Sequence, residues 1–219
     1  MTTGLLFVTA PEADHRQINR ILLRLRVWDT DPDAMDTYKL VTTKNAYDLE
    51  PPACSDGWLP ATSPPLDAAV WDNAWAGASL EDVEAFCLDL HRAPPRSVET
   101  LQFLLVDSEG LRAGDCILGH RRGNDLEAGE FAYLDEFDKM RIPQDQVYTV
   151  WANFVVGNMQ WFEFTQEMED WGVDDEGRLN RGGEDGWFTY REIGGCQLSD
   201  EQRRRKAGEM ERFEREGWI

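Results

Sequence analysis

The residues of this chain that could do acid–base chemistry are three histidines and a surplus of carboxylates. His15, His91 and His120 lie far apart, and none has the H-x-x-x-H or H-E-x-x-H spacing of a helical metal site. His120 directly follows a predicted short strand, a place where functional side chains often lie, and is therefore a candidate base. We favour the alternative, an exposed histidine in a turn, and we expect no metal and no cofactor.

Carboxylates are concentrated in residues 125–185, which contain 16 acids and four bases. Asp135, Glu136 and Asp138 follow a predicted strand at 131–134 and are, with His120, the candidate catalytic residues. Two carboxylates can divide acid and base roles if burial separates their pKa values. Acids at a strand end are more often solvated, so the sequence favours solvated positions over catalysis for all three.

Motifs for nucleotide or calcium binding are not found in the sequence. The Gly182-Gly183 and Gly194-Gly195 pairs lack the spacing of phosphate-binding loops. Residues 174–178 superficially resemble a calcium loop, but the glycine is misplaced and Arg178 occupies a liganding position, which excludes an EF-hand.

The cysteines indicate a reducing compartment. None forms a C-x-x-C pair, and residues 1–7 lack the basic and apolar regions of a signal peptide. We therefore expect a cytoplasmic protein with reduced thiols at Cys54, Cys87, Cys116 and Cys196.

Composition predicts one core and a strongly acidic surface. The 219 residues are 42% hydrophobic and include nine tryptophans, enough apolar material for a single domain. The 42 acids and 22 bases give a net charge of −20, which would repel nucleic acid and anionic membranes. No apolar run approaches the roughly 18 residues of a membrane span. A basic protein partner fits this charge.

The first half of the chain is predicted to contain three strands and two helices. We expect strands at residues 4–9, 18–28 and 101–106, and a helix that Asp31 caps and Pro32 begins. The prolines of residues 50–65 predict an irregular connection. Ser79 begins a second helix, through Leu90, with a capping-box pattern.

The second half alternates short strands with loops. We expect a turn at 108–110, strands at 116–118, 131–134, 147–151 and 187–190, and polar loops at 119–129 and 172–186. Asn158 is predicted to cap a helix whose apolar stripe is Trp161, Phe164, Met168 and Trp171.

Residues from Ser199 onward predict a charged helix with six acids and six bases. Its basic run, 203–206, could dock on the acidic body or on a second copy. We expect a solvated helix instead, because the charge is balanced.

Residues 153–164 resemble the N-L-x-x-x-N-M-D-F-x-E-F signature of an uncharacterised family of small acidic domains, a domain of unknown function common in actinobacteria. The positions that match are Asn153, Asn158, Met159, Glu163 and Phe164, with Trp161 in the aromatic place and Gln160 where the family has Asp. Weaker similarities cover residues 20–182. The resemblance implies one domain and no particular biochemistry.

Together these patterns predict an α+β fold: a mixed sheet of short strands packed against two or three helices in residues 1–198, with the charged helix at 199–219. The leading functional hypothesis is a non-catalytic interaction protein, a monomer or weak homodimer, that binds a basic protein and neither nucleic acid nor membranes. The alternative is a small-molecule enzyme with a Trp-lined pocket and a carboxylate or His base. Mimicry of nucleic acid by the carboxylates also fits the charge.

Overall fold

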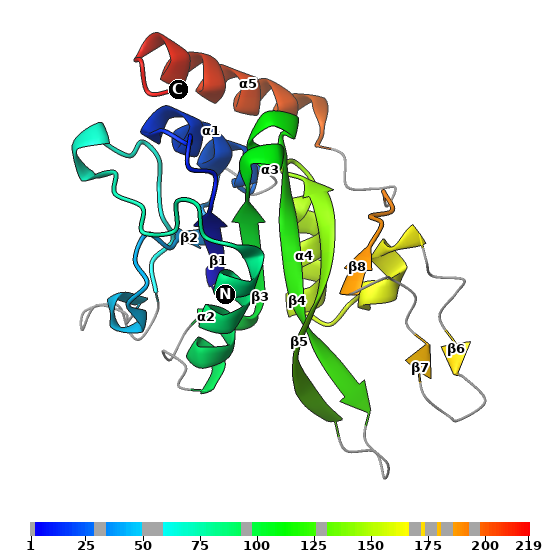
Figure 1. The fold of residues 1–219 in the computed structure, drawn as a ribbon. Helices are drawn as coiled ribbons and strands as arrows, with labels where there is room; N and C mark the ends of the chain where they lie inside the picture. The colour runs from blue at the N-terminus through cyan, green and yellow to red at the C-terminus, as the bar shows by residue number, and fades with distance from the viewer. Residues whose placement is uncertain are drawn as a thin grey trace.

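A computed structural model describes residues 3–28, 34–49, 59–92, 98–125, 131–166, 172–173, 179–180, 186–192 and 198–219. Its centre is a six-stranded sheet in the order β2-β1-β3-β4-β5-β8 (Figure 1). The strands are β1 (Thr3–Val8), β2 (Tyr38–Leu40), β3 (Val98–Val106), β4 (Asp115–Asp125), β5 (Phe131–Pro143) and β8 (Trp187–Phe188). Only β4 runs against the others, so the sheet is mixed.

Helices cover both faces of the sheet. On one face lie α1 (His15–Leu25) and α4 (Val147–Val155), packed on a core that includes Leu6, Leu104 and Leu118. On the other lies α2 (Leu80–Arg92), packed on Leu5 and Phe103 (Figure 1). Successive strand residues point to opposite faces, so each central strand serves both cores. This arrangement confirms the predicted α+β class.

Shorter elements complete the described structure. They are the 3₁₀ turns η1 (Ala46–Leu49), η2 (Ala68–Val70) and η3 (Trp161–Phe164), the helices α3 (Ser108–Ala113) and α5 (Asp200–Arg215), and a separate two-stranded ladder of β6 (Gly172–Val173) and β7 (Leu179–Asn180).

The strand predicted at residues 18–28 is wrong, because this segment is mainly α1. Ile18, Ile21, Leu22 and Leu25 are all buried, and their spacing of three, one and three residues marks one face of a helix. Asp14 caps the helix in a capping box with Gln17. The proposed helix start at Asp31-Pro32 lies outside the described residues, and the chain from residue 34 onward enters β2 without an α-helix.

The strand predicted at 147–151 is also wrong, since these residues begin α4. Val147, Val150 and Trp151 are buried at helical spacing. The predicted loop at 119–129 is replaced by strand over 119–125, and β5 continues to Pro143. The far part of this β4–β5 hairpin extends beyond the rest of the sheet (Figure 1), where polar side chains are expected on an exposed ribbon.

The predicted turn after Asp107 is instead α3, for which Asp107 is the N-cap. Asn158 does not cap a helix: it donates to the Asn153 side chain at 2.7 Å, and η3 follows. Met168 and Trp171 lie outside the described residues, as do Pro51, Pro52 and most of the segment 174–185.

Most of the other predicted elements are confirmed. Ser79 and Asp82 form the expected capping interaction of α2, with backbone-to-side-chain distances of 3.0 and 3.2 Å. The strands predicted at 4–9, 101–106, 116–118 and 131–134 are present in β1, β3, β4 and β5. The strand predicted at 187–190 is present over 187–188 as β8, and the helix after Ser199 is α5.

The C-terminal helix is docked, so the solvated helix we expected is wrong. Phe213 is 1% exposed, and α5 lies beside α1 (Figure 1). The Asn19 amide donates to the Trp218 carbonyl at 3.0 Å, and Arg26 pairs with Glu209 at 3.3 Å. Of the basic run, Lys206 reaches Asp145, whereas Arg203 and Arg204 are exposed. Burial of Phe213, together with one hydrogen bond and two ion pairs to other elements, therefore docks a helix of balanced charge.

Among the described helices, none is both long and apolar enough to cross a bilayer.

Candidate functional site

The sheet register brings two of the predicted catalytic residues together. Gln102, His120 and Asp138 are cross-strand neighbours on β3, β4 and β5. They lie two positions from Leu104, Leu118 and Met140, which belong to the core beneath α4. Because side chains alternate along a strand, the three polar residues share this face. We call them the polar row.

Aromatic rings from α4 and η3 cover His120. Its ring is stacked with Phe154 at a centroid distance of 5.2 Å and with Trp161 at 5.4 Å, and the ring planes are within 22° of each other. Phe154 and Trp161 are themselves parallel at 5.5 Å. Such contacts hold the imidazole in place and leave mainly its edge for hydrogen bonding.

Asp138 is buried in an ion pair. It is 2% exposed, and Arg122 approaches Asp138 Oδ1 with Nε at 2.8 Å and Nη2 at 2.6 Å. Removing a partner from a buried charge is costly, so this contact stabilises the fold. A paired, buried carboxylate is a poor candidate for a general base.

Asp135 and Glu136 are not part of the polar row. They are exposed on the β4–β5 ribbon, where Asp135 pairs with Arg92 at 3.0 Å and Arg121 at 2.9 Å, and Glu136 pairs with Arg122 at 2.6 Å. These contacts identify them as members of a surface network.

The remaining histidines are separate from this site. His15 begins α1, and the His91 ring is 3.0 Å from the Thr100 hydroxyl. Burial and the charge of Arg121 lower the pKa of His91. In the part of the chain that the structure describes, no three His, Cys, Asp or Glu residues are placed to hold a metal ion.

The carboxyl edge of the parallel strands, where open α/β sheets commonly bind ligands, is filled by the chain itself. The Asn73 amide donates to the Val8 carbonyl at 2.7 Å, and Gly77 N–H donates to the Thr9 carbonyl at 2.8 Å. Beside them, Arg141 bridges Asp107 at 2.7 Å and Asp115 at 3.0 Å. This edge is therefore closed by hydrogen bonds and ion pairs.

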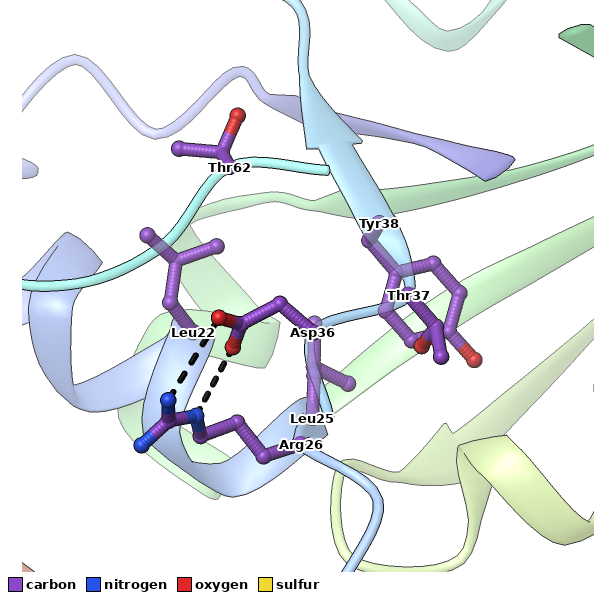
Figure 2. Close-up of a pocket in the computed structure, with 7 residues that line it drawn as sticks. All are labelled: Leu22, Leu25, Arg26, Asp36, Thr37, Tyr38 and Thr62. Atoms are coloured by element: carbon purple, nitrogen blue, oxygen red, sulfur yellow. Dashed lines mark hydrogen bonds and ion pairs between the residues drawn. The ribbon is translucent and has the colours of Figure 1, made fainter. Parts of the chain in front are cut away.

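A small pocket lies between α1 and β2 (Figure 2). It has about 10 Å³ of room, close to the space that one water molecule needs. Figure 2 shows Arg26 reaching across it to Asp36, with nitrogen–oxygen distances of 2.8 and 3.4 Å. A substrate of ordinary size would not fit here.

The two described cysteines are not candidate nucleophiles. Cys87 and Cys116 are buried, and burial raises the pKa of both thiols far above its ordinary value. Cys54 and Cys196 lie outside the described residues.

A second acidic segment differs from residues 125–185 because it has no bases of its own. Residues 45–91 contain nine acids and neither Lys nor Arg. In the described part of this segment, Glu84 pairs with Lys139 and Asp89 with Arg92. The others are exposed and form no ion pair with a described Lys or Arg; they are Asp48, Asp67, Asp72, Glu81 and Asp82. We call these five residues the acidic surface.

The residues of the family-like signature have structural contacts. Asn153 donates to the Thr149 carbonyl at 2.8 Å, and the Glu163 carboxylate accepts from Gln160 N–H at 2.6 Å. Phe164 is fully buried. They close the end of α4 and begin η3, which places Trp161 over His120.

No family model matches the chain, and no curated protein and no solved structure matches it either. The resemblance of residues 153–164 to the acidic-domain family therefore stays a prediction.

Sequence reasoning found His120 and Asp138 but missed Gln102, Arg122 and Phe154. The register between neighbouring strands brings these residues close together, and a register cannot be predicted from the sequence until both strands have been located. Extending the strand from Leu118 by two residues would have given the one available signal, since it puts His120 on the same face.

Proposed function

We propose that this protein is a non-catalytic binding protein whose acidic surface receives a basic protein partner. The observation that carries the proposal is the 45–91 segment, whose nine acids are accompanied by no Lys or Arg. Its exposed carboxylates raise the local concentration of a cationic partner and speed its association. A cytoplasmic location and a monomeric or weakly dimeric state belong to the same proposal.

The ion pairs elsewhere support this choice of surface. Along β4 and β5, Arg121, Arg122, Lys139 and Arg141 each contact at least one carboxylate. Acids on β4 and β5 thus have cations beside them, whereas the exposed acids around η1, η2 and the start of α2 have no described ion pair. A basic segment of a partner gains most binding free energy where the carboxylates have no ion pair with a Lys or Arg of this chain.

The experiment is calorimetric titration of the full chain with a 12-residue Arg/Lys peptide at 50 and 300 mM NaCl. We expect binding that weakens at least tenfold at the higher salt, because screening shortens the reach of exposed charges. Asp72→Asn/Glu81→Gln should weaken binding several-fold, since neither side chain has a described ion pair.

The matched control is Glu211→Gln/Glu214→Gln, which removes the same charge from exposed positions of α5. If both double variants weaken binding equally, only net charge matters and the acidic surface is not the binding site. If the peptide does not bind at 50 mM NaCl, the proposed function is wrong.

One observation favours a second function, a small-molecule enzyme that uses His120 as base. His120 and Asp138 are direct cross-strand neighbours, as a base and its orienting carboxylate would be. Native mass spectrometry of the purified chain tests this. A bound small molecule that is lost in His120→Ala would favour the enzyme, and a mass of the polypeptide alone would count against it.

A further inference from the structure

On the α4 side of the sheet, three buried polar atoms make no hydrogen bond to any described residue. They are Gln102 Oε1, Trp151 Nε1 and Trp161 Nε1, on side chains that are 4%, 1% and 6% exposed. Folded proteins leave few such groups unpaired, because a buried donor or acceptor without a partner costs about 1–3 kcal/mol. Three in one region call for a bound partner.

The other two buried tryptophans among the described residues are paired. Trp28 Nε1 donates to the Leu23 carbonyl at 3.3 Å, and Trp75 Nε1 donates to the Thr43 carbonyl at 3.0 Å. The unpaired indoles are therefore a local property of the α4 side of the sheet.

The three atoms surround the inner part of the polar row. Gln102 is the register neighbour of His120, over which Trp161 is stacked. On its other side, Gln102 precedes Phe103, the register partner of Leu5, and the β1–β3 register shifts between Thr3 and Leu5, so Gly4 lies at an irregularity beside Gln102. Trp151 Nε1 would be only 3.3 Å from a Cβ on Gly4. The absence of a side chain at Gly4 thus brings an indole N–H over the row.

Size and chemistry decide what the partner is. The two indole N–H donors and the Gln102 carbonyl acceptor suit a bound molecule that can both accept and donate hydrogen bonds. A small-molecule site usually needs a cavity of about 300 Å³ or more, whereas one buried water makes about three hydrogen bonds in little more than its own volume. Proteins hold about one buried water per 27 residues, or roughly eight in a chain of this length. Water fits both the size and the chemistry.

We infer that the inner polar row is a hydration site, in which ordered water between the sheet and α4 bonds Gln102, Trp151 and Trp161. This water completes the hydrogen bonding of the buried row beside His120. The site is independent of the proposed partner binding on the acidic surface.

The test is a water-selective nuclear Overhauser measurement on the ¹⁵N-labelled full chain. The indole signals are assigned with single Trp→Phe variants. We expect Trp151 and Trp161 N–H protons to show cross-peaks to long-lived water. Trp28 and Trp75 N–H protons, equally buried but bonded to carbonyls, should show none and are the internal controls. Absence of water cross-peaks at the Trp151 and Trp161 N–H protons would overturn the inference.

A second measurement uses Gln102→Leu, with Gln102→Met as the substitute if Leu prevents folding. In a hydrated row either change takes a partner from bound water, and the midpoint of thermal unfolding falls. If the polar row contained no water, either substitution would remove a buried oxygen that has no hydrogen-bond partner, and the midpoint of thermal unfolding would rise. A rise would therefore contradict the inference. Density for a molecule larger than water in a crystal of the full chain would also contradict it.

Discussion

Arg122 connects the surface of the β4–β5 ribbon to its interior. One guanidinium contacts exposed Glu136 with Nη1 and buried Asp138 with Nη2, both at 2.6 Å. Since the Asp138 carboxylate is 3% exposed, its charge depends on this neighbour far more than a solvated carboxylate would.

Arg122→Met should therefore lower the free energy of unfolding by about 3 kcal/mol, because it leaves a buried carboxylate without its cation. Arg92→Met is the matched control. Arg92 also contacts two carboxylates, but its side chain is 61% exposed, and such pairs contribute about 0–1 kcal/mol. Urea unfolding of both variants measures the difference. Equal losses would show that burial of Asp138 does not matter.

Asp107 carries a pH-dependent part of the stability. Partial burial alone would raise its pKa, but hydrogen bonds from Arg141 and from the Gly110 N–H outweigh burial and lower it. The folded state therefore binds the proton more weakly than the unfolded chain does, and the stabilisation is complete above the unfolded pKa, about 3.9.

Asp107→Asn should cost about 1–2 kcal/mol at pH 7, because it weakens both the α3 cap and the contact with Arg141. As the pH falls through the lowered folded pKa, the wild-type carboxylate is protonated and the difference between the two proteins shrinks. Unfolding measured between pH 7 and pH 3 checks this. A difference that stays constant over that range would contradict the assignment.

At the scale of elements, α5 shows how little contact a helix needs to dock. Its N-terminus has a capping box from Ser199 and Gln202, and Phe213 is its one buried side chain among the described residues. Charge balance alone predicted a solvated helix, but burial of an aromatic side chain contributes about 2–3 kcal/mol.

Phe213→Ala should lower the free energy of unfolding by about 3 kcal/mol and increase amide exchange throughout α5. Gly208→Ala, on the same helix with open space around it, should do the opposite and add about 0.5–1 kcal/mol. Hydrogen exchange of α5 in both variants gives the measurement. Unchanged exchange in Phe213→Ala would mean that other contacts hold the helix.

The elements that sequence reasoning predicted correctly have strong local signals. The Ser79 cap, the apolar run of β3 and the charged repeat of α5 each specify their structure within a few residues. α1 and α4 were misassigned because their β-branched and leucine-rich segments fit two periodicities over a short window, and tertiary packing decides between them. The β4–β5 ribbon was missed because its polar residues look like a loop until they are paired across strands.

At the scale of the whole molecule, net charge opposes compaction. A charge of −20 on one chain gives self-repulsion, which screening by salt relieves. The ion pairs along β5 weaken with salt, but exposed pairs contribute little.

The thermal midpoint should therefore rise by several degrees between 10 and 200 mM NaCl at pH 7. Differential scanning calorimetry measures it. Sodium sulfate at equal ionic strength separates screening from ion-specific effects, since sulfate adds stabilisation of its own. A midpoint that falls with NaCl would show that specific ion pairs outweigh the repulsion.

The bond from the Asn19 amide to the Trp218 carbonyl joins positions 199 residues apart. The same side chain also holds residue 66, accepting from its N–H at 2.6 Å. In a pulling experiment that grips the chain at residues 3 and 219, the load from the C-terminal end would reach this junction before it reaches the sheet. Because α5 is held by one apolar anchor and β1 is enclosed between two strands, α5 should detach at low force and the sheet should rupture later. The molecule would then extend in two mechanical steps.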